Sequence, residues 1–234
     1  MLLDSFKLHN LVFQVQYENA YALWDGAGTI AQKLSDIWPN LALHEGQPNQ
    51  QTLTGDGVQI QSGLNTSTVT ISNSKALDAH HAQLLMKTFE VWQSELMLTK
   101  LKRLSTRIVF EKNFPTIGEA NAFFLDRELV KWPTSKVFDQ SLDAGQNGID
   151  LQFRFEDEKS FSVLRVRAEK LKMDVNLDPY FFEEAKLAKE KNRSVIDFDR
   201  GLLGSVDATT VRVDEWLKGV HHILRRDLEK VIKA

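Results

Sequence analysis

The sequence contains no cysteine, and this absence excludes several kinds of chemistry. Disulfide bonds, thiolate nucleophiles, iron–sulfur clusters and cysteine-ligated zinc are all ruled out, so any metal would need His, Asp or Glu ligands. Long uncharged apolar runs are also missing, and none approaches the roughly 18 residues that a membrane-spanning helix requires. Residues 1–7 lack the basic and apolar regions of a secretory signal. We therefore expect a cytoplasmic protein with no membrane partner.

Arginine is absent from the first hundred residues, and all eleven arginines lie between Arg103 and Arg226. Residues 1–100 carry 5 Lys against 9 Asp and Glu, a net charge of −4, whereas residues 101–234 carry 24 basic and 23 acidic residues, a net charge of +1. The whole chain has a net charge of −3, with 42% hydrophobic and 26% charged residues. This composition is typical of a folded protein and excludes a disordered or polybasic chain. The sequence has no recognisable catalytic or cofactor motif, and we expect no cofactor.

The first hundred residues change between strand and helix patterns. Residues 11–17 alternate between apolar side chains and the polar Gln14 and Gln16, which predicts a half-buried strand. Apolar residues that recur every three or four positions predict helices, and apolar residues that recur every second position predict strands. The predicted helices are residues 20–38 and 76–98, and the predicted strands between them are residues 58–61 and 68–71.

A similar order follows after residue 100. Thr116 and Glu119 form a capping box, which predicts that a helix begins there and continues through Leu129. Residues 149–156 alternate strictly and predict a strand. The other predicted elements are strands at 104–111, at 161–171 with a bulge at Val163 and Leu164, and at 194–199, and helices at 180–191, after Asp178-Pro179, and at 211–232.

These elements predict an α+β fold with two halves, residues 1–100 and 101–234, which form one compact unit. Each half has the order strand, helix, meander, long helix, and the second half carries a helical insert at residues 178–192. If the halves are a true repeat, we expect an antiparallel sheet, or two joined sheets, with the long helices on one face. That arrangement is similar in outline to the duplicated saddle of TATA-binding-protein-like folds. The alternative is that two α+β segments share an order by chance.

The polar sides of the predicted strands carry long glutamine and arginine side chains. If helices cover one face of the sheet, these side chains point away from the helices. The face is then either a solvated surface or a surface that binds a protein or an anionic partner. The candidate binding residues are Gln14, Gln16, Arg107, Gln152, Arg154, Arg165 and Arg167.

Asp197 and Asp199 lie two residues apart on a predicted strand, so both carboxylates lie on one face of it. Such a pair can hold a divalent cation or divide acid and base roles, as in a metal-dependent hydrolase or nuclease. The alternative, which we favour, is that these carboxylates form ion pairs with arginines on a neighbouring strand, for example Arg165 or Arg167.

Two histidine doublets, His80-His81 and His221-His222, lie on predicted helices. Adjacent residues on a helix are about 100° apart and cannot face one ion together, unlike a pair at spacing i, i+4. We therefore predict no metal site. His81 and His221 are predicted to be buried structural side chains with hydrogen-bond partners.

The C-terminal third resembles a known family. Residues Val195-Ile196-Asp197-Phe198-Asp199, followed by Trp216-Leu217, His221, Ile223 and Glu229, are similar to the ending of a sporadically distributed family of bacterial conserved hypothetical proteins. Residues 101–107, with Arg103 and Arg107, resemble the central strand of that family. The chain departs from the family by lacking an acidic–aromatic segment after this strand, and by the insert at 180–191. The resemblance implies a bacterial origin and an α+β fold, but no reaction.

Taken together, these patterns favour a non-enzymatic binding or regulatory module, with a homo-oligomer as an open alternative. Tyr180, Phe181 and Phe182 either cap the core or form a dimer contact. An enzyme that uses Asp197 and Asp199 is the second hypothesis. A nucleic-acid-binding protein that uses the arginine-bearing half is the third, and the net negative charge of the chain disfavours it.

Overall fold

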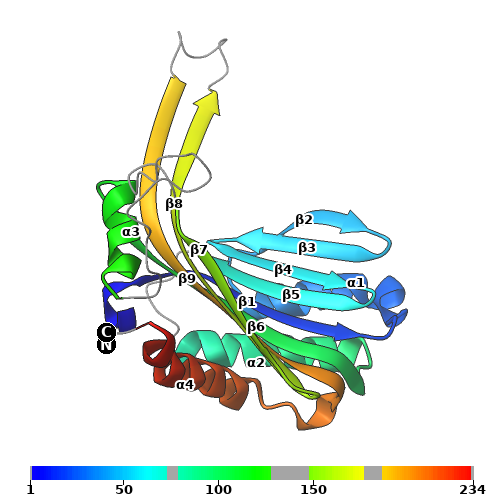
Figure 1. The fold of residues 1–234 in the computed structure, drawn as a ribbon. Coiled ribbons are helices and arrows are strands. Elements are labelled where there is room, and N and C mark those ends of the chain that lie inside the picture. The colour runs from blue at the N-terminus through cyan, green and yellow to red at the C-terminus, as the bar shows by residue number, and fades with distance from the viewer. Residues whose placement is uncertain (1, 73–78, 128–147, 177–185, 233–234) are drawn as a thin grey trace.

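The computed structural model describes residues 2–72, 79–127, 148–176 and 186–232 (Figure 1). The first half contains β1 (Lys7–Tyr17), α1 (Ala22–Ile37), β2 (Ala42–Gln47), β3 (Gln50–Gly55), β4 (Val58–Gly63), β5 (Thr66–Ser72) and α2 (Ala79–Glu95). The second half contains β6 (Lys100–Phe114), α3 (Ile117–Leu125), β7 (Asp150–Glu156), β8 (Ser160–Asn176), β9 (Lys186–Asp207) and α4 (Val213–Val231). The predicted α+β fold is confirmed.

The nine strands of the described residues belong to one sheet with the order β2-β3-β4-β5-β1-β6-β9-β8-β7. Every neighbouring pair is antiparallel. The first strands of the two halves, β1 and β6, pair with each other at the centre. After its first strand, each half crosses to an outer edge of the sheet, and its meander then returns inward to pair with that first strand. Both halves therefore have the same strand arrangement apart from the additional β2. An evolutionary duplication stays a prediction.

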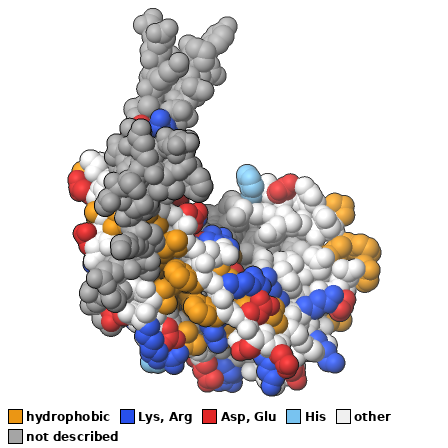
Figure 2. All heavy atoms as spheres, in the orientation of Figure 1, with side chains coloured by type: hydrophobic (Ala, Val, Ile, Leu, Met, Phe, Trp, Pro, Cys, Tyr) orange, Lys and Arg blue, Asp and Glu red, His pale blue; other side chains and the backbone are white. Residues whose placement is uncertain are grey.

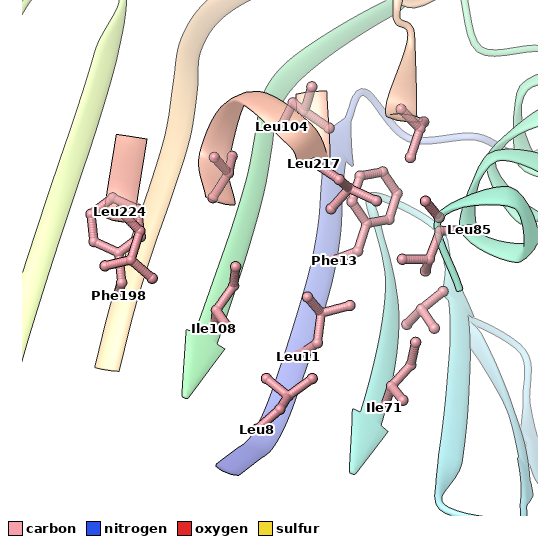
Figure 3. Packing of buried hydrophobic residues seen from close by; sticks show 14 of the residues in the cluster. Leu8, Leu11, Phe13, Ile71, Leu85, Leu104, Ile108, Phe198, Leu217 and Leu224 are labelled. Carbon is pink, nitrogen blue, oxygen red and sulfur yellow. The ribbon is translucent and has the colours of Figure 1, made fainter. Parts of the chain in front are cut away.

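The helices lie along one side of the sheet (Figure 1), where one hydrophobic cluster joins both halves. Figure 3 shows Leu11 and Phe13 of β1 on the same side of the sheet as Leu85 of α2 and Leu217 of α4. Each of these four side chains is almost completely buried. Burial of a large apolar side chain contributes about 1.5–3 kcal/mol, so this shared cluster holds the helices against the central strands.

Three tryptophan side chains tie this helical layer to its neighbours through indole hydrogen bonds. Trp38, which follows α1, donates to Thr88 of α2 over 2.8 Å. Trp92 of α2 donates to Ser62 of β4 over 2.8 Å, and Trp216 of α4 donates to Thr106 of β6 over 2.9 Å. A buried indole N–H needs such an acceptor, so the hydroxyls of Ser62 and Thr106 position α2 and α4 on the sheet, and that of Thr88 joins the end of α1 to α2.

Several predicted elements are confirmed. The strand at 11–17 belongs to β1, and the helices predicted at 20–38, 76–98 and 211–232 are α1, α2 and α4, each shorter by a few residues in the described chain. The capping box also forms, because the Glu119 amide donates to the Thr116 hydroxyl over 3.2 Å at the start of α3. Leu129, the predicted end of that helix, lies outside the described residues.

Two predicted features of the second half are wrong. The bulge at Val163 and Leu164 is absent from the described pairing, since β8 keeps a continuous register with both β7 and β9 across these residues. The insert predicted as helix extends into residues 186–192, which instead belong to β9. Pairing with β8 overrides the helical tendency of this charged stretch, with Leu187 opposite Val175. Residues 177–185, including Tyr180, Phe181 and Phe182, lie outside the described residues.

Candidate functional site

The face of the sheet opposite the helices presents polar side chains, and we call it the open face, because no helix of the described residues lies on it. Its composition follows from alternation, since β1 directs Leu11, Phe13 and Val15 into the core and therefore directs Gln14 and Gln16 to the other side. Strand pairing extends this face across the sheet. One row contains Val12, Arg107, Asp199, Val163 and Arg154, and the next contains Asn10, Val109, Asp197, Arg165 and Gln152.

All seven candidate binding residues thus lie on the open face. Gln14 and Gln16 come from β1, Arg107 from β6, and the others from β7 and β8. They form a continuous surface only because β1 and β6 pair at the centre of the sheet. Whether they bind a partner stays a prediction.

The part of the open face around Gln14 consists mainly of uncharged polar side chains, and Glu45 of β2 lies at the outer edge of the same row. Gln14 lies opposite Thr68 of β5, which in turn lies opposite Gln61 of β4. A hollow of about 260 Å³ lies here, lined by Gln14, Asn19, Asn49, Gln50, Gln61, Gly63, Leu64, Asn65, Thr66 and Thr68. In Figure 2 the surface over β2 and β3, at the upper right, is mostly white, with histidine, acidic and hydrophobic side chains along its outer edge. Amides and hydroxyls both donate and accept hydrogen bonds, so this part suits neutral polar groups.

The part built by the second half is charged, and its centre is an ion pair between Arg107 and Asp197. Arg107 donates from Nε and Nη2 to the two carboxylate oxygens of Asp197, over 2.8 and 2.6 Å. Arg165 Nη1 lies 3.6 Å from the same carboxylate. The Asp197 side chain is completely buried beneath these two arginines. The predicted pairing of this carboxylate with Arg165 is confirmed, whereas Arg167 pairs with Glu169.

Asp199 lies beside this pair in a different environment. Burial raises the pKa of Asp199, and the nearby Arg103 and Arg107 guanidinium groups oppose that rise only in part. Arg103 lies 3.6 Å from the Asp199 carboxylate and stacks over the ring of Phe161, 4.4 Å from its centre. The ring lies against Gly201, where any side chain would collide with it. Asp199 is therefore enclosed on one side by an ordered arginine and aromatic pair.

A second charged cluster surrounds Glu111 at the other end of the face. Lys191 and Arg193 each donate to Glu111 over 2.6 Å, and Arg193 also donates to Glu169 over 2.6 Å. Burial alone would raise the pKa of Glu111, but these hydrogen bonds hold it below its usual value. His9 lies 3.5 Å from the same carboxylate, and burial lowers its pKa.

Most positive charge on this face is therefore neutralised within the protein. Each arginine discussed above lies within 4.0 Å of a carboxylate, and Arg154 pairs with Glu156 over 2.5 Å. The face consequently offers arginine hydrogen-bond donors without a large excess of positive charge.

Comparison of the sequence with models of known protein families finds no match, and no curated protein matches it. The resemblance of the C-terminal third therefore stays a prediction, as do a bacterial origin and a cytoplasmic location. In the described part of the chain no helix has the length and apolar character needed to cross a membrane.

The hypothesis of an aspartate metal site meets a geometric obstacle. Both oxygens of Asp197 already accept hydrogen bonds from Arg107, and Asp199 offers a single further carboxylate. Across the described ranges no group of three or more His, Asp and Glu side chains could hold a metal ion. Neither aspartate is arranged as a ligand in this structure.

The burial predicted for the two structural histidines is wrong. His81 and His221 are both only half-buried, because each lies at the edge of the apolar stripe of its helix. The hydrogen bond predicted for His221 is present, since Arg225 Nε donates to its Nε2 over 3.3 Å. Burial and the neighbouring Arg225 lower the pKa of His221.

Sequence reasoning missed several members of the charged clusters, above all Glu111, Arg193 and Glu169. One signal was available: Glu111 is four residues after Arg107 on a predicted strand and must share its face. The predicted strand begins at residue 194, immediately after Arg193, and the prediction therefore did not place Arg193 on the sheet.

Proposed function

We propose that the chain is a non-enzymatic binding module that holds a polar segment of a partner protein against the open face of its sheet. The observation that supports this most is the contrast between the two faces. One face is buried beneath the helices, and the other has no helix of the described residues over it but carries an ordered array of long polar side chains.

The chemistry of the open face favours a protein over a nucleic acid. Phosphate binding depends on cations that gain their counter-charge from the ligand. Here Arg107, Arg165 and Arg193 already have carboxylates from this chain. A protein segment, by contrast, offers amide and carbonyl groups that match the amides and hydroxyls of the first half.

The side chains are also held in place before any partner arrives. Arg165 donates from Nε to Gln152 over 2.6 Å, and Arg107 is fixed by two hydrogen bonds to Asp197. Ordering a long side chain on binding costs about 0.5–1.5 kcal/mol, and prior fixation removes part of that cost. The face is therefore suited to binding without large rearrangement.

The proposal is tested by purifying the tagged protein from its host with its partners and identifying the partners by mass spectrometry. The double variant Gln152→Ala with Arg154→Ala removes two exposed side chains of β7, and we expect it to recover at least tenfold less of a specific partner protein. Lys218→Ala on α4 is the matched control, since Lys218 is exposed on the helical side. Equal recovery of that partner by the folded double variant would contradict the proposal. The proposal would also be contradicted if the partner that the double variant fails to recover is a nucleic acid.

A further inference from the structure

A separate apolar cleft lies on the helical side of the sheet, between the C-terminal half of α4 and the outer strands. It has a volume of about 440 Å³, within the size range of small-molecule sites. Its apolar lining includes Phe155, Leu164, Phe198, Leu224, Leu228 and Val231. Leu164 lies opposite Phe198 in the register and both belong to the core cluster, so this cleft is not part of the open face.

The cleft has a buried floor and an exposed aromatic wall. Leu224 and Leu228 of α4 are each only 2% exposed, whereas Phe155 at the end of β7 is 56% exposed. An exposed phenylalanine beside a concave apolar surface is a common feature of ligand and partner sites. A ligand that covered Phe155 would remove this apolar area from water.

The rim of the cleft is positively charged. Among the described residues that line it, Arg200, Arg226 and Lys230 face the single carboxylate of Asp227. Arg226 and Lys230 share that carboxylate, at 2.5 and 2.6 Å, and Arg200 donates to the Ser162 hydroxyl over 2.7 Å. Three cations facing one carboxylate leave a positive excess at the rim.

We propose that this cleft binds a small amphiphile that has an apolar chain and an anionic head, of the class of medium-chain carboxylates. The chain lies on Phe155 and Leu228, and the head accepts hydrogen bonds from the basic side chains at the rim. A concave site of this volume fits a small molecule, and the charge of its rim selects an anion. This inference is independent of the function proposed for the open face.

The test uses decanoate as the probe, with binding to the full chain measured by isothermal titration calorimetry. We expect saturable binding of one decanoate per chain, and at least tenfold weaker binding of decanol and decylammonium, which have the same chain length. Phe155→Ser, and Arg226→Gln combined with Lys230→Gln, should each weaken decanoate binding at least tenfold. Because these side chains are exposed, the variants should keep the wild-type circular dichroism spectrum and melting temperature.

Lys218→Gln is the control, since it removes an exposed lysine from the other end of the same helix. It should leave decanoate binding unchanged. The proposal is overturned if decanoate does not bind saturably, if decanol binds equally well, or if the folded Phe155 variant binds decanoate with wild-type affinity.

Discussion

Arg107 of β6 and Asp197 of β9 are 90 residues apart in the sequence and form a two-point ion pair across neighbouring strands. The Asp197 side chain is fully buried, and Arg107 donates to both of its carboxylate oxygens. We expect Arg107→Met to lower the free energy of unfolding by about 3 kcal/mol, the lower end of the cost of breaking a buried pair, because Arg165 still lies near the carboxylate. Chemical denaturation measures this change.

The control for this prediction removes both charges together. Arg107→Met combined with Asp197→Leu leaves no unpaired buried charge, so it should regain most of the stability lost in the single variant. A single variant as stable as the wild-type protein would show that the pair does not hold the strands.

A second prediction concerns the indole of Trp92, which donates to the Ser62 hydroxyl within the core. Ser62→Ala leaves this N–H without its acceptor, and we expect the protein to lose about 1–3 kcal/mol of unfolding free energy. Ser94→Ala, at an exposed serine two residues along α2, should change stability by less than about 0.5 kcal/mol. Urea denaturation of both variants decides the matter, and equal stabilities would rule out this role for Ser62.

A third prediction follows from the contact between Gly201 and Phe161. A Cβ at position 201 would lie 2.3 Å from the Phe161 ring and 3.0 Å from the carbonyl oxygen of Leu104. Gly201→Ala must therefore displace the ring, at a cost of about 1–3 kcal/mol. Gly28→Ala in α1 has no atom within 4 Å of the new Cβ and should raise stability by about 0.5–1 kcal/mol. Thermal melting should shift in opposite directions, and a shift in the same direction would refute the steric argument.

A fourth prediction concerns acid stability. The pKa of Glu111 is lowered in the folded protein, so its ionised form stabilises the fold above the unfolded-state pKa. That contribution is lost as the pH falls through the unfolded-state pKa toward the folded-state pKa. Glu111→Gln should lower stability at pH 7 and flatten the decline in acid, as denaturation measured at several pH values would show. A variant that keeps the wild-type decline would contradict this role.

Asp199 serves as a control, because its pKa is shifted in the direction opposite to that of Glu111. Because the pKa of Asp199 is raised in the folded protein, its contribution to the free energy of unfolding is fully present below the unfolded-state pKa. That contribution is lost as the pH rises through the folded-state pKa. In the wild-type protein it therefore opposes the acid decline caused by Glu111. Asp199→Asn should make the decline between neutral and acidic pH larger, and a smaller decline would mean that the sign of the shift is wrong.

Alternation of side chains explains why the open face could be predicted from sequence. One face of each strand is buried, so the apolar residues of β1 determine the direction of Gln14 and Gln16, and the same reasoning places Arg107. Strand pairing is different, because it joins residues far apart in the chain. No local pattern indicates that Arg107 meets Asp197. Arg167 and Glu169, by contrast, lie two residues apart on one face of a predicted strand, and their pairing could have been predicted.

Three parts of the sheet, namely β2, β3 and the start of β9, could not be predicted from their local sequences. β2 and β3 consist largely of polar residues and glycine, with Leu53 as their single buried aliphatic side chain, so they lack a clear strand pattern. Residues 186–191 are rich in charge and compatible with a helix, and only the partner strand β8 makes them extended.

The most direct test of the open face as a protein-binding surface is site-specific photo-crosslinking in the host cell. A photoreactive residue replaces either Gln59, exposed on the open face, or Gln32, exposed on α1. The account predicts that one partner protein is crosslinked from position 59 and not from position 32. Crosslinking of that protein from position 32 alone, or equally from both positions, would contradict it.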